Sequence, residues 1–553
     1  MGGLAADRAR RWLVAAASGC TLKLVATTLL ALATAAIFTW PAPVAGNDLL
    51  VGRGFDASGM LWMAWYAGEH LGESGLTSTV TGHPAGETLH GTDAWLHLLA
   101  AWLLPLASAR AQHLIAWLGC AATFVAGERM AARGFGARWP WSLAAGAAFA
   151  CNGVAFGALV AGRHYHLFQA GLPLFAWAWV WVLEGRRTGL AAGFAWVLCL
   201  ASSAYTALLA TLMGGWLWLF HPGRRRTLSQ QVLAGVPAGL AALAFVSVFS
   251  TGEREVVTAG APALEHVSRS VTLSSLLGWN PAHGETALFS GAALGFAAFG
   301  LALAGVRLLP RRQWLPLLSG GLVATLLAFG PQAVALPLAS EPVSTPWAWL
   351  AEVWPASGEL RFHARFQLVA HLAFGTLAAL VLSASRAGWL RGVLLAGVFV
   401  DALFWGRPLD AAVTVAAPGN PVYATIERGP VLDVLPNASS PLDRGVLNAV
   451  HHACASQALH GQVVVDPCLL PSTRGTTGAA LRRRLLPALV GGEVGRARRG
   501  LREAGVSTVV AHLDLFTSAD AAGIERTLLQ VGRNPRSGVG GGERLLVVDV
   551  GAP

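Results

Sequence analysis

The sequence has little charge of either sign. Only 12% of its 553 residues are charged, whereas a soluble domain usually carries about 25%. A chain this apolar needs a solvent other than water for much of its surface, which excludes an ordinary soluble protein. Lysine is nearly absent, because Lys23 is the only one and arginine supplies almost all of the positive charge. Heptads, low-complexity tracts and repeats of about 20 to 50 residues are also missing, which argues against repeat architectures.

Cysteine is scarce, and its spacing does not fit a zinc site. Of the six cysteines, Cys454 and Cys468 stand in a polar C-terminal region. The other four lie in apolar segments, where cysteine behaves as a small hydrophobe: Cys20, Cys120, Cys151 and Cys199. The only glycine-rich run, within residues 538–542, is followed by no lysine and opens no helix, so it is not a phosphate-binding loop. We interpret it as a turn before the last strand.

Hydrophobic residues are abundant instead, at 54% of the chain, and the 22 tryptophans are typical of a membrane–water interface. A helical span needs about 20 apolar residues. The stretch 189–220 is too long for one span and is interrupted near Ser202 to Tyr205, so we interpret it as two short spans. Nine further segments are predicted to form one span each, which gives about eleven spans in total. They are 22–40, 111–128, 139–158, 167–184, 231–250, 287–306, 313–337, 362–384 and 389–405.

The arginines predict the orientation of these spans. They gather in short clusters between the apolar runs, at 8–11, 129–138, 186–187, 224–226, 307–312 and 386–391. Loops rich in arginine face the cytoplasm, and an even number of spans separates neighbouring clusters if residues 94–108, with Pro105, form a re-entrant or interfacial helix. The net charge of +10 is therefore an orientation signal, and we expect no nucleic-acid partner. The N-terminus is predicted in the cytoplasm and the tail outside.

The predicted fold class is an all-α polytopic membrane domain, residues 1–405, followed by a small α/β domain outside the membrane, residues 406–553. The membrane domain has a long first outer loop, residues 41–110. In the tail, β-like runs alternate with helical patterns, which favours an α/β domain. The runs are 430–435, 462–465, 507–510 and 545–548, and the helical patterns are 478–486, 493–504 and 519–531.

The first outer loop holds the most unusual polar residues. Asp48 and Asp56 follow the first span, and a carboxylate there can act as a general base or hold a divalent cation such as Mg²⁺ or Mn²⁺. Asp56 can equally cap the helix that starts at Ala57. His83 lies in the same loop, but the spacing of the loop's histidines and acids matches no known zinc pattern.

The segment 162–169 carries charge at the outer mouth of two spans. It contains Arg163, His164 and His166. Charged residues at membrane depth are costly, so they indicate a functional site by default. The alternative for Arg163 is that its guanidinium snorkels to the interface.

The segment 358–366 also opens a span from the outer side. It contains Glu359, Arg361 and Arg365. Because the positive-inside rule disfavours arginine on this side, we expect an anionic partner for the two arginines. A lipid phosphate is the natural candidate, and Glu359 is the alternative.

The order of these features resembles the GT-C superfamily of membrane glycosyltransferases, which includes oligosaccharyltransferases, protein O-mannosyltransferases and lipid A aminoarabinose transferases. It is most similar to a branch of uncharacterised bacterial membrane proteins related to them. The usual first acidic position of that pattern reads Arg53 or Gly52 here, which leaves Asp48 upstream and Asp56 as the aligned acid. The matches extend over most of residues 20–405: Asp56 with Trp62 and Trp65, residues 83–86, residues 162–166, Ser202 to Tyr205, and Arg361 to Phe366.

This resemblance implies a sugar transfer, with inversion, from a polyprenyl-phosphate-linked donor to an unidentified envelope acceptor on the outer face of a bacterial plasma membrane. Asp56, with Asp48 as the second candidate, would deprotonate or orient the acceptor, with or without a divalent cation. The tail would help to bind the acceptor. The donor phosphate would contact Arg361, Arg365 and Arg163, and the expected substrate-binding residues are His83, His164, His166, Tyr205 and Glu359.

Two other function classes are left open. The first is a non-catalytic membrane component that binds a lipid or a polymer during envelope assembly. The second is a transporter, against which we find no acidic residue that we expect to be buried within a span and no paired broken helices.

Cys454 and Cys468 predict a disulfide. Both are placed by the topology in an oxidising compartment, where disulfides persist, and the polar tail has no other cysteine. Closing a loop of about 15 residues is worth roughly 3 kcal/mol by chain-entropy arguments. The alternative is two free thiols buried separately, since a Cα–Cα distance above about 7 Å forbids the bond.

Overall fold

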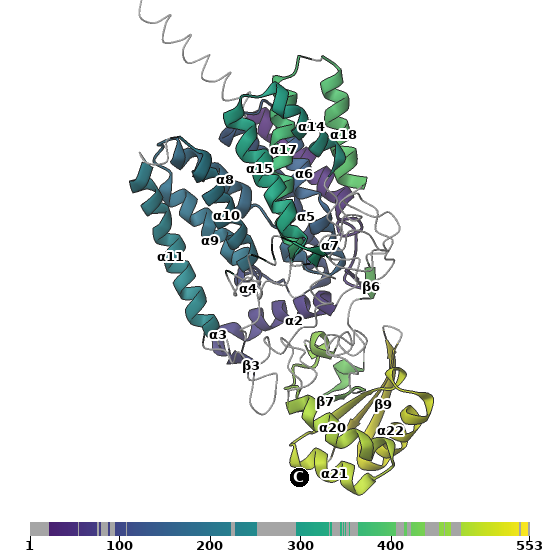
Figure 1. Cartoon of the computed structure of the whole chain (residues 1–553). Coiled ribbons are helices and arrows are strands. Elements are labelled where there is room, and N and C mark those ends of the chain that lie inside the picture. Colours follow the sequence, from purple (N-terminus) through teal and green to yellow (C-terminus); the bar gives the residue numbers. More distant parts are fainter. Residues whose placement is uncertain are drawn as a thin grey trace, which may run out of the picture.

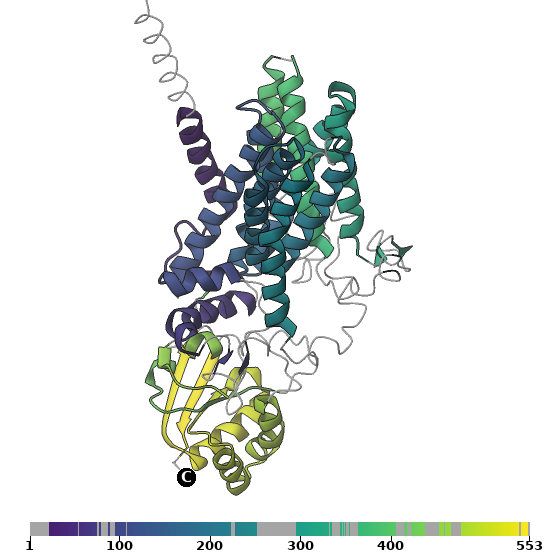
Figure 2. The ribbon, with the colours of Figure 1, turned by 90° about the vertical axis from the view of Figure 1, so that its left-hand side faces the viewer.

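The structure is a computed structural model of the whole chain. It describes residues 21–52, 55–74, 77–78, 87–88, 95–106, 108–222, 227–250, 295–330, 332–333, 343–345, 347, 349, 353, 363–386, 388–404, 414–416, 422–436, 453–457, 459–465, 477–540 and 543–550. The described part consists of a helical bundle and a smaller tail domain at one end of it (Figures 1 and 2).

Each segment that the sequence predicts to be a span contains a helix in the part of the chain that the structure describes. Six helices of the described part are long and apolar enough to cross a membrane, and three shorter ones are also apolar. The membrane domain is therefore helical and polytopic, while the count of about eleven spans stays a prediction. The helices are Thr21–Phe38, α5 (Ala109–Arg129), α6 (Leu143–Ala150), α7 (Gly153–Val160), α8 (Gly171–Leu183), α9 (Gly189–Ser202), α10 (Ala204–Phe220), α11 (Leu228–Ser250), α14 (Phe296–Leu308), α15 (Arg311–Ala328), α17 (Gln367–Ala384) and α18 (Leu390–Phe404).

Short 3₁₀ and π segments join these helices at the positions that matter below. A π turn, η1 (Met130–Gly134), extends α5, and the 3₁₀ segments η2 (His164–Leu167) and η7 (His363–Phe366) precede α8 and α17. Ser203 separates α9 from α10, because its backbone is extended (φ −174°) and its hydroxyl accepts a hydrogen bond from the Tyr205 N–H. The long apolar stretch is thus two helices, broken where the sequence predicts.

Two helices of the first outer loop lie across the end of the bundle. They are α2 (Phe55–Glu69), followed by the single turn α3 (Leu71–Ser74), and α4 (Trp95–Leu103). Figure 1 shows them between the bundle and the tail. Ala64 and Ala67 of α2 pack against Leu98 and Ala101 of α4. The short length of α4, which ends before Pro105, agrees with an interfacial helix.

The tail is a four-stranded sheet covered by three helices. The strand order is β7-β8-β10-β9, with β7 (Val431–Val434) parallel to β8 (Thr508–His512) and the other pairs antiparallel. The remaining strands are β9 (Arg533–Gly540) and β10 (Glu543–Asp549), and the helices are α20 (Thr477–Val490), α21 (Val494–Glu503) and α22 (Ser518–Val531). Three predicted β-like runs are strands, whereas the run 462–465 makes only an isolated bridge between Val464 and Val431. Gly538 and Gly540, which the sequence assigned to a turn, belong to β9.

The two faces of the sheet have different partners. Leu432, Val509 and Val548 pack against the helices α20 to α22. On the other face, Val431, Val510 and Val547 share a core with Trp62 and the other aromatic residues of α2. The helix α2 is therefore enclosed between the bundle and the tail. Its alanines face one side and its aromatic rings face the other.

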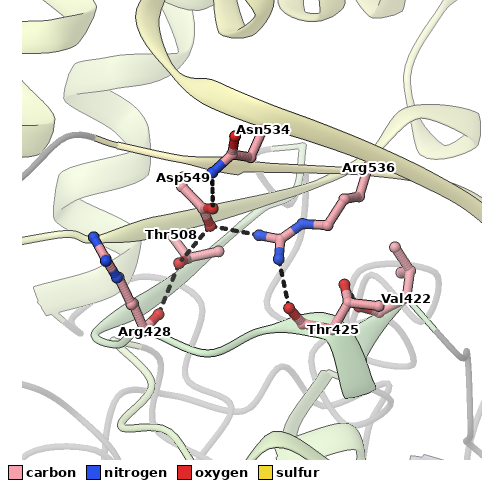
Figure 3. A network of polar contacts seen from close by, with 7 residues as sticks. All are labelled: Val422, Thr425, Arg428, Thr508, Asn534, Arg536 and Asp549. Carbon is pink, nitrogen blue, oxygen red and sulfur yellow. Dashed lines mark hydrogen bonds and ion pairs between the residues drawn. The ribbon is translucent and has the colours of Figure 1, made fainter.

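A polar network joins three strands of this sheet to the segment before β7 (Figure 3). The Asp549 carboxylate accepts from the Arg536 guanidinium, from Asn534 Nδ2 at 3.4 Å and from the Thr508 hydroxyl at 3.4 Å. Arg536 also donates to the Thr425 carbonyl, and Thr508 donates to the Arg428 carbonyl at 2.7 Å. These bonds tie β8, β9 and β10 to the segment that leads into β7. They therefore fix the position of that segment against the sheet.

Two carboxylates are buried within predicted spans, which corrects the expectation that none is. Glu128 in α5 is 1% exposed and accepts from the Ser142 hydroxyl at 2.7 Å beside Arg129 at 3.2 Å. Asp401 in α18 is 6% exposed and accepts from the Ala297 N–H at 2.9 Å, at the first turn of α14. Both carboxylates hold helices together, so they add nothing in favour of a transporter.

Candidate functional site

Two glycines bring the first outer loop against the segment 162–166. Gly52 (φ +115°) and Gly162 (φ +77°) have backbones that side chains rarely adopt. A Cβ on Gly52 would lie 2.6 Å from the Gly162 Cα, and a Cβ on Gly162 would lie 2.3 Å from the Ala57 Cβ. The backbone at the start of α2, where Asp56 stands, therefore lies directly against Gly162.

Two histidines hold the strand that precedes this contact. The Val51 N–H donates to His113 Nε2 at 3.2 Å, and His164 Nε2 donates to the Val51 carbonyl at 2.7 Å. Because His113 Nε2 accepts, its Nδ1 carries the proton and donates to the Ala45 carbonyl at 3.3 Å. His164 is fully buried. Its ring positions the first loop, and the expected contact of His164 with substrate stays a prediction.

The same loop is also tied to the start of the tail. Strand β1 (Leu49–Val51) pairs antiparallel with β6 (Thr414–Ala416), and Val51 lies opposite Thr414. Further along, the Trp62 indole N–H donates to Gln457 Oε1 at 2.8 Å, and both side chains are fully buried. The position of α2 therefore depends on the bundle and on the tail together.

Arg365 is the cation at the centre of the described site. Its guanidinium donates to His166 Nε2 at 2.9 Å and to the Ser203 hydroxyl at 3.1 Å, and it lies over the Tyr205 ring at 4.6 Å. Since His166 Nε2 accepts from a cation, the ring is the neutral Nδ1–H tautomer. The structure thus joins three segments that are far apart in the sequence, and it brings together Arg365, His166 and Tyr205 from the predicted set.

Neighbouring polar groups hold His166 in place. Gln169 Nε2 donates to the His166 carbonyl at 2.7 Å, and Gln169 Oε1 accepts from the Thr206 hydroxyl at 3.1 Å. The Tyr165 and His166 rings lie 4.1 Å apart. Gly162, which lies against the start of α2, is four residues before His166 in the sequence. The cluster is consequently a set of polar side chains whose positions are fixed by hydrogen bonds.

An apolar cavity begins directly beneath this polar cluster. It has a volume of about 270 Å³ and lies between α8, α10, α15 and α17, and among the described residues of its lining only Thr376 is polar. Along α10 the lining residues Leu209 and Trp216 follow Tyr205, and along α17 the lining starts at Phe366, next to Arg365. A charged head group at Arg365 would therefore have an apolar space below it.

The other predicted site residues are placed as follows. Asp48 is exposed on the loop before β1, and Arg163 is partly buried at the start of η2. Asp56 lies in the first turn of α2, and its side chain is outside the described residues. Cys454 is disulfide-bonded, but its predicted partner is not described, so the pairing stays a prediction. The residues outside the described part are His83, Glu359, Arg361 and Cys468.

The sequence analysis missed three polar residues that build this end of the bundle. His113 holds Val51 as described, and Gln112 Nε2 lies 3.5 Å from His97 Nε2. Burial lowers the pKa of His97 to about 4, so the ring is neutral at pH 7. His113 could have been found from the sequence, because it is a histidine inside an apolar segment. Polar residues in a span usually have a specific partner.

The described donors do not form a metal site. No group of three or more His, Cys, Asp or Glu in the described ranges is arranged to hold a metal ion. His113 and His164 are engaged with Val51, and the Arg365 cation on His166 opposes a second cation there. The expected divalent cation stays a prediction, and its ligands would include residues outside the described part, such as the Asp56 carboxylate.

Comparison with known proteins shows the fold. No protein-family model and no curated protein sequence matches the chain. The structure is similar to the arabinofuranosyltransferase AftD from mycobacteria, with a TM-score of 0.60 and 16% identity over 96% of this chain and 40% of that one. It is also similar to the oligosaccharyltransferase AglB from Archaeoglobus fulgidus in complex with an inhibitory peptide and dolichol-phosphate, with a TM-score of 0.52 and 11% identity over 93% of this chain and 72% of that one.

Another AglB structure, in complex with Zn and sulfate, has a TM-score of 0.51 and 12% identity over 89% of this chain and 68% of that one. The present chain spans well under half of the length of AftD. The similarity covers nearly the whole of the present chain, including the bundle, the first outer loop and the tail. The chain has the fold of the GT-C-type membrane glycosyltransferases.

Proposed function

We propose that this protein is a membrane glycosyltransferase that transfers a sugar from a polyprenyl-phosphate-linked donor to an envelope acceptor. The observation that carries the proposal is the position of Arg365 next to Phe366, which lines the apolar cavity. A lipid-linked sugar phosphate has a long apolar chain, an anionic phosphate and a polar sugar. Phe366 lines the cavity, and its neighbour Arg365 donates to His166 of the polar cluster, so an apolar space, a cation and polar groups adjoin one another.

The cavity suits the lipid part of this donor. Its lining along α10 and α17 is apolar, and it lies within the membrane bundle, so burying an isoprenoid unit there removes apolar surface from water. Arg365 is already oriented by Ser203, His166 and Tyr205. A preorganised guanidinium binds phosphate with little loss of side-chain freedom and offers two parallel N–H donors.

The same cation would assist the chemical step. When the bond between the sugar and the phosphate oxygen breaks, negative charge develops on the leaving lipid phosphate, and a fixed guanidinium stabilises that charge. The acceptor hydroxyl forms the new glycosidic bond and loses its proton. We assign the proton to the Asp56 carboxylate, since the first turn of α2 lies against Gly162, two residues from His164. Arg361 is the second proposed phosphate ligand.

The structural relatives support the class of donor. AglB has been solved with dolichol-phosphate and a peptide, which are a lipid phosphate and a peptide ligand in a protein of the same fold. Sequence identities of 11 to 16% support a common fold only. We therefore do not infer the sugar or the acceptor of this protein from those of AftD and AglB. We also propose, from the arginine clusters, that the polar cluster and the tail face the outer side of a bacterial plasma membrane.

The experiment that tests this function is the identification of a copurified lipid. The protein is purified in mild detergent, and bound lipids are extracted and identified by mass spectrometry. A polyprenyl phosphate or its sugar conjugate is the expected result. A preparation that contains only bulk phospholipids, and that does not bind added polyprenyl phosphate, would contradict the proposal.

Transfer itself is tested with Asp56→Asn, which removes the base and keeps the side-chain size. We expect loss of sugar transfer to membrane acceptors with unchanged lipid binding. Asp520→Asn, in the first turn of α22 in the tail, is the matched control and should stay active. If wild-type protein binds the lipid but transfers no sugar from any donor, the non-catalytic alternative is correct.

A further inference from the structure

The end of the tail that is farthest from the bundle carries an unusual concentration of arginine. Residues 477–503 contain seven arginines and only two acidic residues, Glu493 and Glu503. They form α20 and α21, which Figure 1 shows at the far end of the tail. On α21 the side toward the domain core is Ala497, Gly500 and Leu501, which are buried. Its arginines therefore lie on the exposed side.

The two helices present their arginines as one surface. Arg484 of α20 reaches the seam between the helices, where its Nη2 lies 4.0 Å from the position of a Cβ on Gly500 and 3.7 Å from the Glu503 carboxylate. Arg496 pairs with Glu493 at 3.3 Å. We call Arg484, Arg496, Arg499 and Arg502 the arginine face. All four are exposed.

Two members of the arginine face are available for a partner. In the part of the chain that the structure describes, no ion pair or hydrogen bond engages the guanidinium of Arg499 or Arg502. They stand three residues apart, so they occupy the same side of α21 about one turn apart. Two guanidinium groups at this spacing can each bind a carboxylate or a phosphate in bidentate geometry.

The composition of this surface argues against a protein partner and against the lipid bilayer. Within the described residues 480–503, no large hydrophobic side chain is exposed, whereas the core of a protein interface is rich in aromatic and apolar residues. The bundle, which the membrane surrounds, lies at the opposite end of the tail (Figures 1 and 2). A hydrated polymer with repeated negative charges fits a surface that is polar, exposed and rich in guanidinium groups.

We propose that the arginine face of α20 and α21 binds an anionic polysaccharide. The charges of the polymer are uronate carboxylates or phosphodiesters, which present the same oxygen chemistry to arginine. The binding depends on exposed charges, so it weakens as salt rises toward about 0.15 M, where the Debye length is about 8 Å. This inference does not depend on the transferase activity, because it concerns a surface remote from Arg365.

The test uses the full-length protein in a neutral detergent and fluorescently labelled polymers in a binding titration. We expect polygalacturonate, a carboxylate polymer, or a glycerol phosphate polymer to bind, and neutral dextran to bind at least about tenfold more weakly. The comparison of the two anionic polymers identifies the anion. Equal binding of dextran, or no binding of either anionic polymer at low salt, would overturn the proposal.

Matched variants locate the surface. Arg499→Gln with Arg502→Gln should weaken binding by about tenfold, since each exposed charge pair contributes modestly. The control is Arg428→Gln with Arg533→Gln, which also removes two positive charges from the tail. It should change the Kd for the polymer by no more than about twofold relative to the wild-type protein. Equal losses in both pairs would mean that net charge alone attracts the polymer, and the proposed surface would be wrong.

Two competitors separate the alternatives. Phosphatidylcholine vesicles that contain phosphatidylglycerol test the membrane surface, and a DNA duplex tests nucleic acid. Tighter binding of either one than of both anionic polysaccharides would overturn the assignment. Thermal unfolding of the variants checks that they are folded, and we expect no change because both exchanged side chains are exposed.

Discussion

Replacement of Arg365 is the most informative perturbation of the proposed donor site. Arg365→Gln removes the charge and the guanidinium fork but keeps a polar side chain near Ser203 and His166. A hydrogen bond to a charged group is worth about 1.5–3 kcal/mol. Loss of the contact to a lipid phosphate should therefore raise the Kd for polyprenyl phosphate by about 10- to 100-fold. Arg365→Lys, which retains the charge, should weaken binding less than Arg365→Gln.

The assay is a titration of the detergent-solubilised protein with polyprenyl phosphate, followed by native mass spectrometry. Arg391→Gln is a matched control, because Arg391 also lies over an aromatic ring, at 4.8 Å from the Trp141 centroid, and donates to the Ser385 carbonyl at 3.2 Å. It belongs to the arginine cluster that we place at the cytoplasmic side. Its replacement should leave the Kd unchanged.

Arg365→Gln also has a structural effect that must be separated from binding. His166 Nε2 loses its donor, and a buried acceptor left without a donor costs about 1–3 kcal/mol. A lower thermal midpoint is therefore expected for this variant whether or not it binds lipid. An unchanged Kd in folded Arg365→Gln would show that Arg365 only supports the bundle, and the proposed donor site would be refuted.

Four further predictions follow from other parts of the chain. A reporter inserted near position 440 should be accessible from outside the cell, and a cytoplasmic signal would contradict the proposed topology. Trp62→Phe removes the donor to a buried glutamine and should destabilise the docked tail by about 1–3 kcal/mol, measured as faster limited proteolysis of the tail. Burial lowers the pKa of His460 to about 4. Because the unfolded ring titrates near 6.5, stability should fall as the pH drops from about 6.5 toward 4, by up to about 3 kcal/mol, and His460→Gln should flatten this dependence. Non-reducing mass spectrometry of peptides should find Cys454 joined to Cys468, and alkylation of Cys468 without prior reduction would contradict this pair.

Much of the membrane domain was predictable from the sequence, because the bilayer imposes strong local rules. Every backbone group of a span must be satisfied within its own helix, so apolar length alone locates α5, α8 and α17. The break at Ser203 was also predictable, since a serine pair and a tyrosine interrupt an apolar run. The strands β7, β8 and β10 were visible as short runs rich in valine and leucine.

The arrangement of the candidate site was predictable only in part. The resemblance placed Arg365, His166 and Tyr205 in one expected set, and the structure brings these three together. The resemblance did not predict that His164 would donate a hydrogen bond to the Val51 carbonyl. The tautomer and the partner of a histidine depend on the groups that the fold places beside it. The resemblance also missed His113, whose partner lies 62 residues away in the sequence.

The sequence by itself determined that the chain is a membrane protein, which segments contain its apolar helices, and that a polar α/β tail follows them. These properties depend on local composition, on hydrophobic length and on the period of the side chains. Only the tertiary structure decided that α2 would be enclosed between the bundle and the tail, that Gly52 would meet Gly162, and that Arg365 would stand above an apolar cavity. Such contacts join residues that are distant in the chain, and they depend on how whole helices pack against one another, which no local pattern encodes.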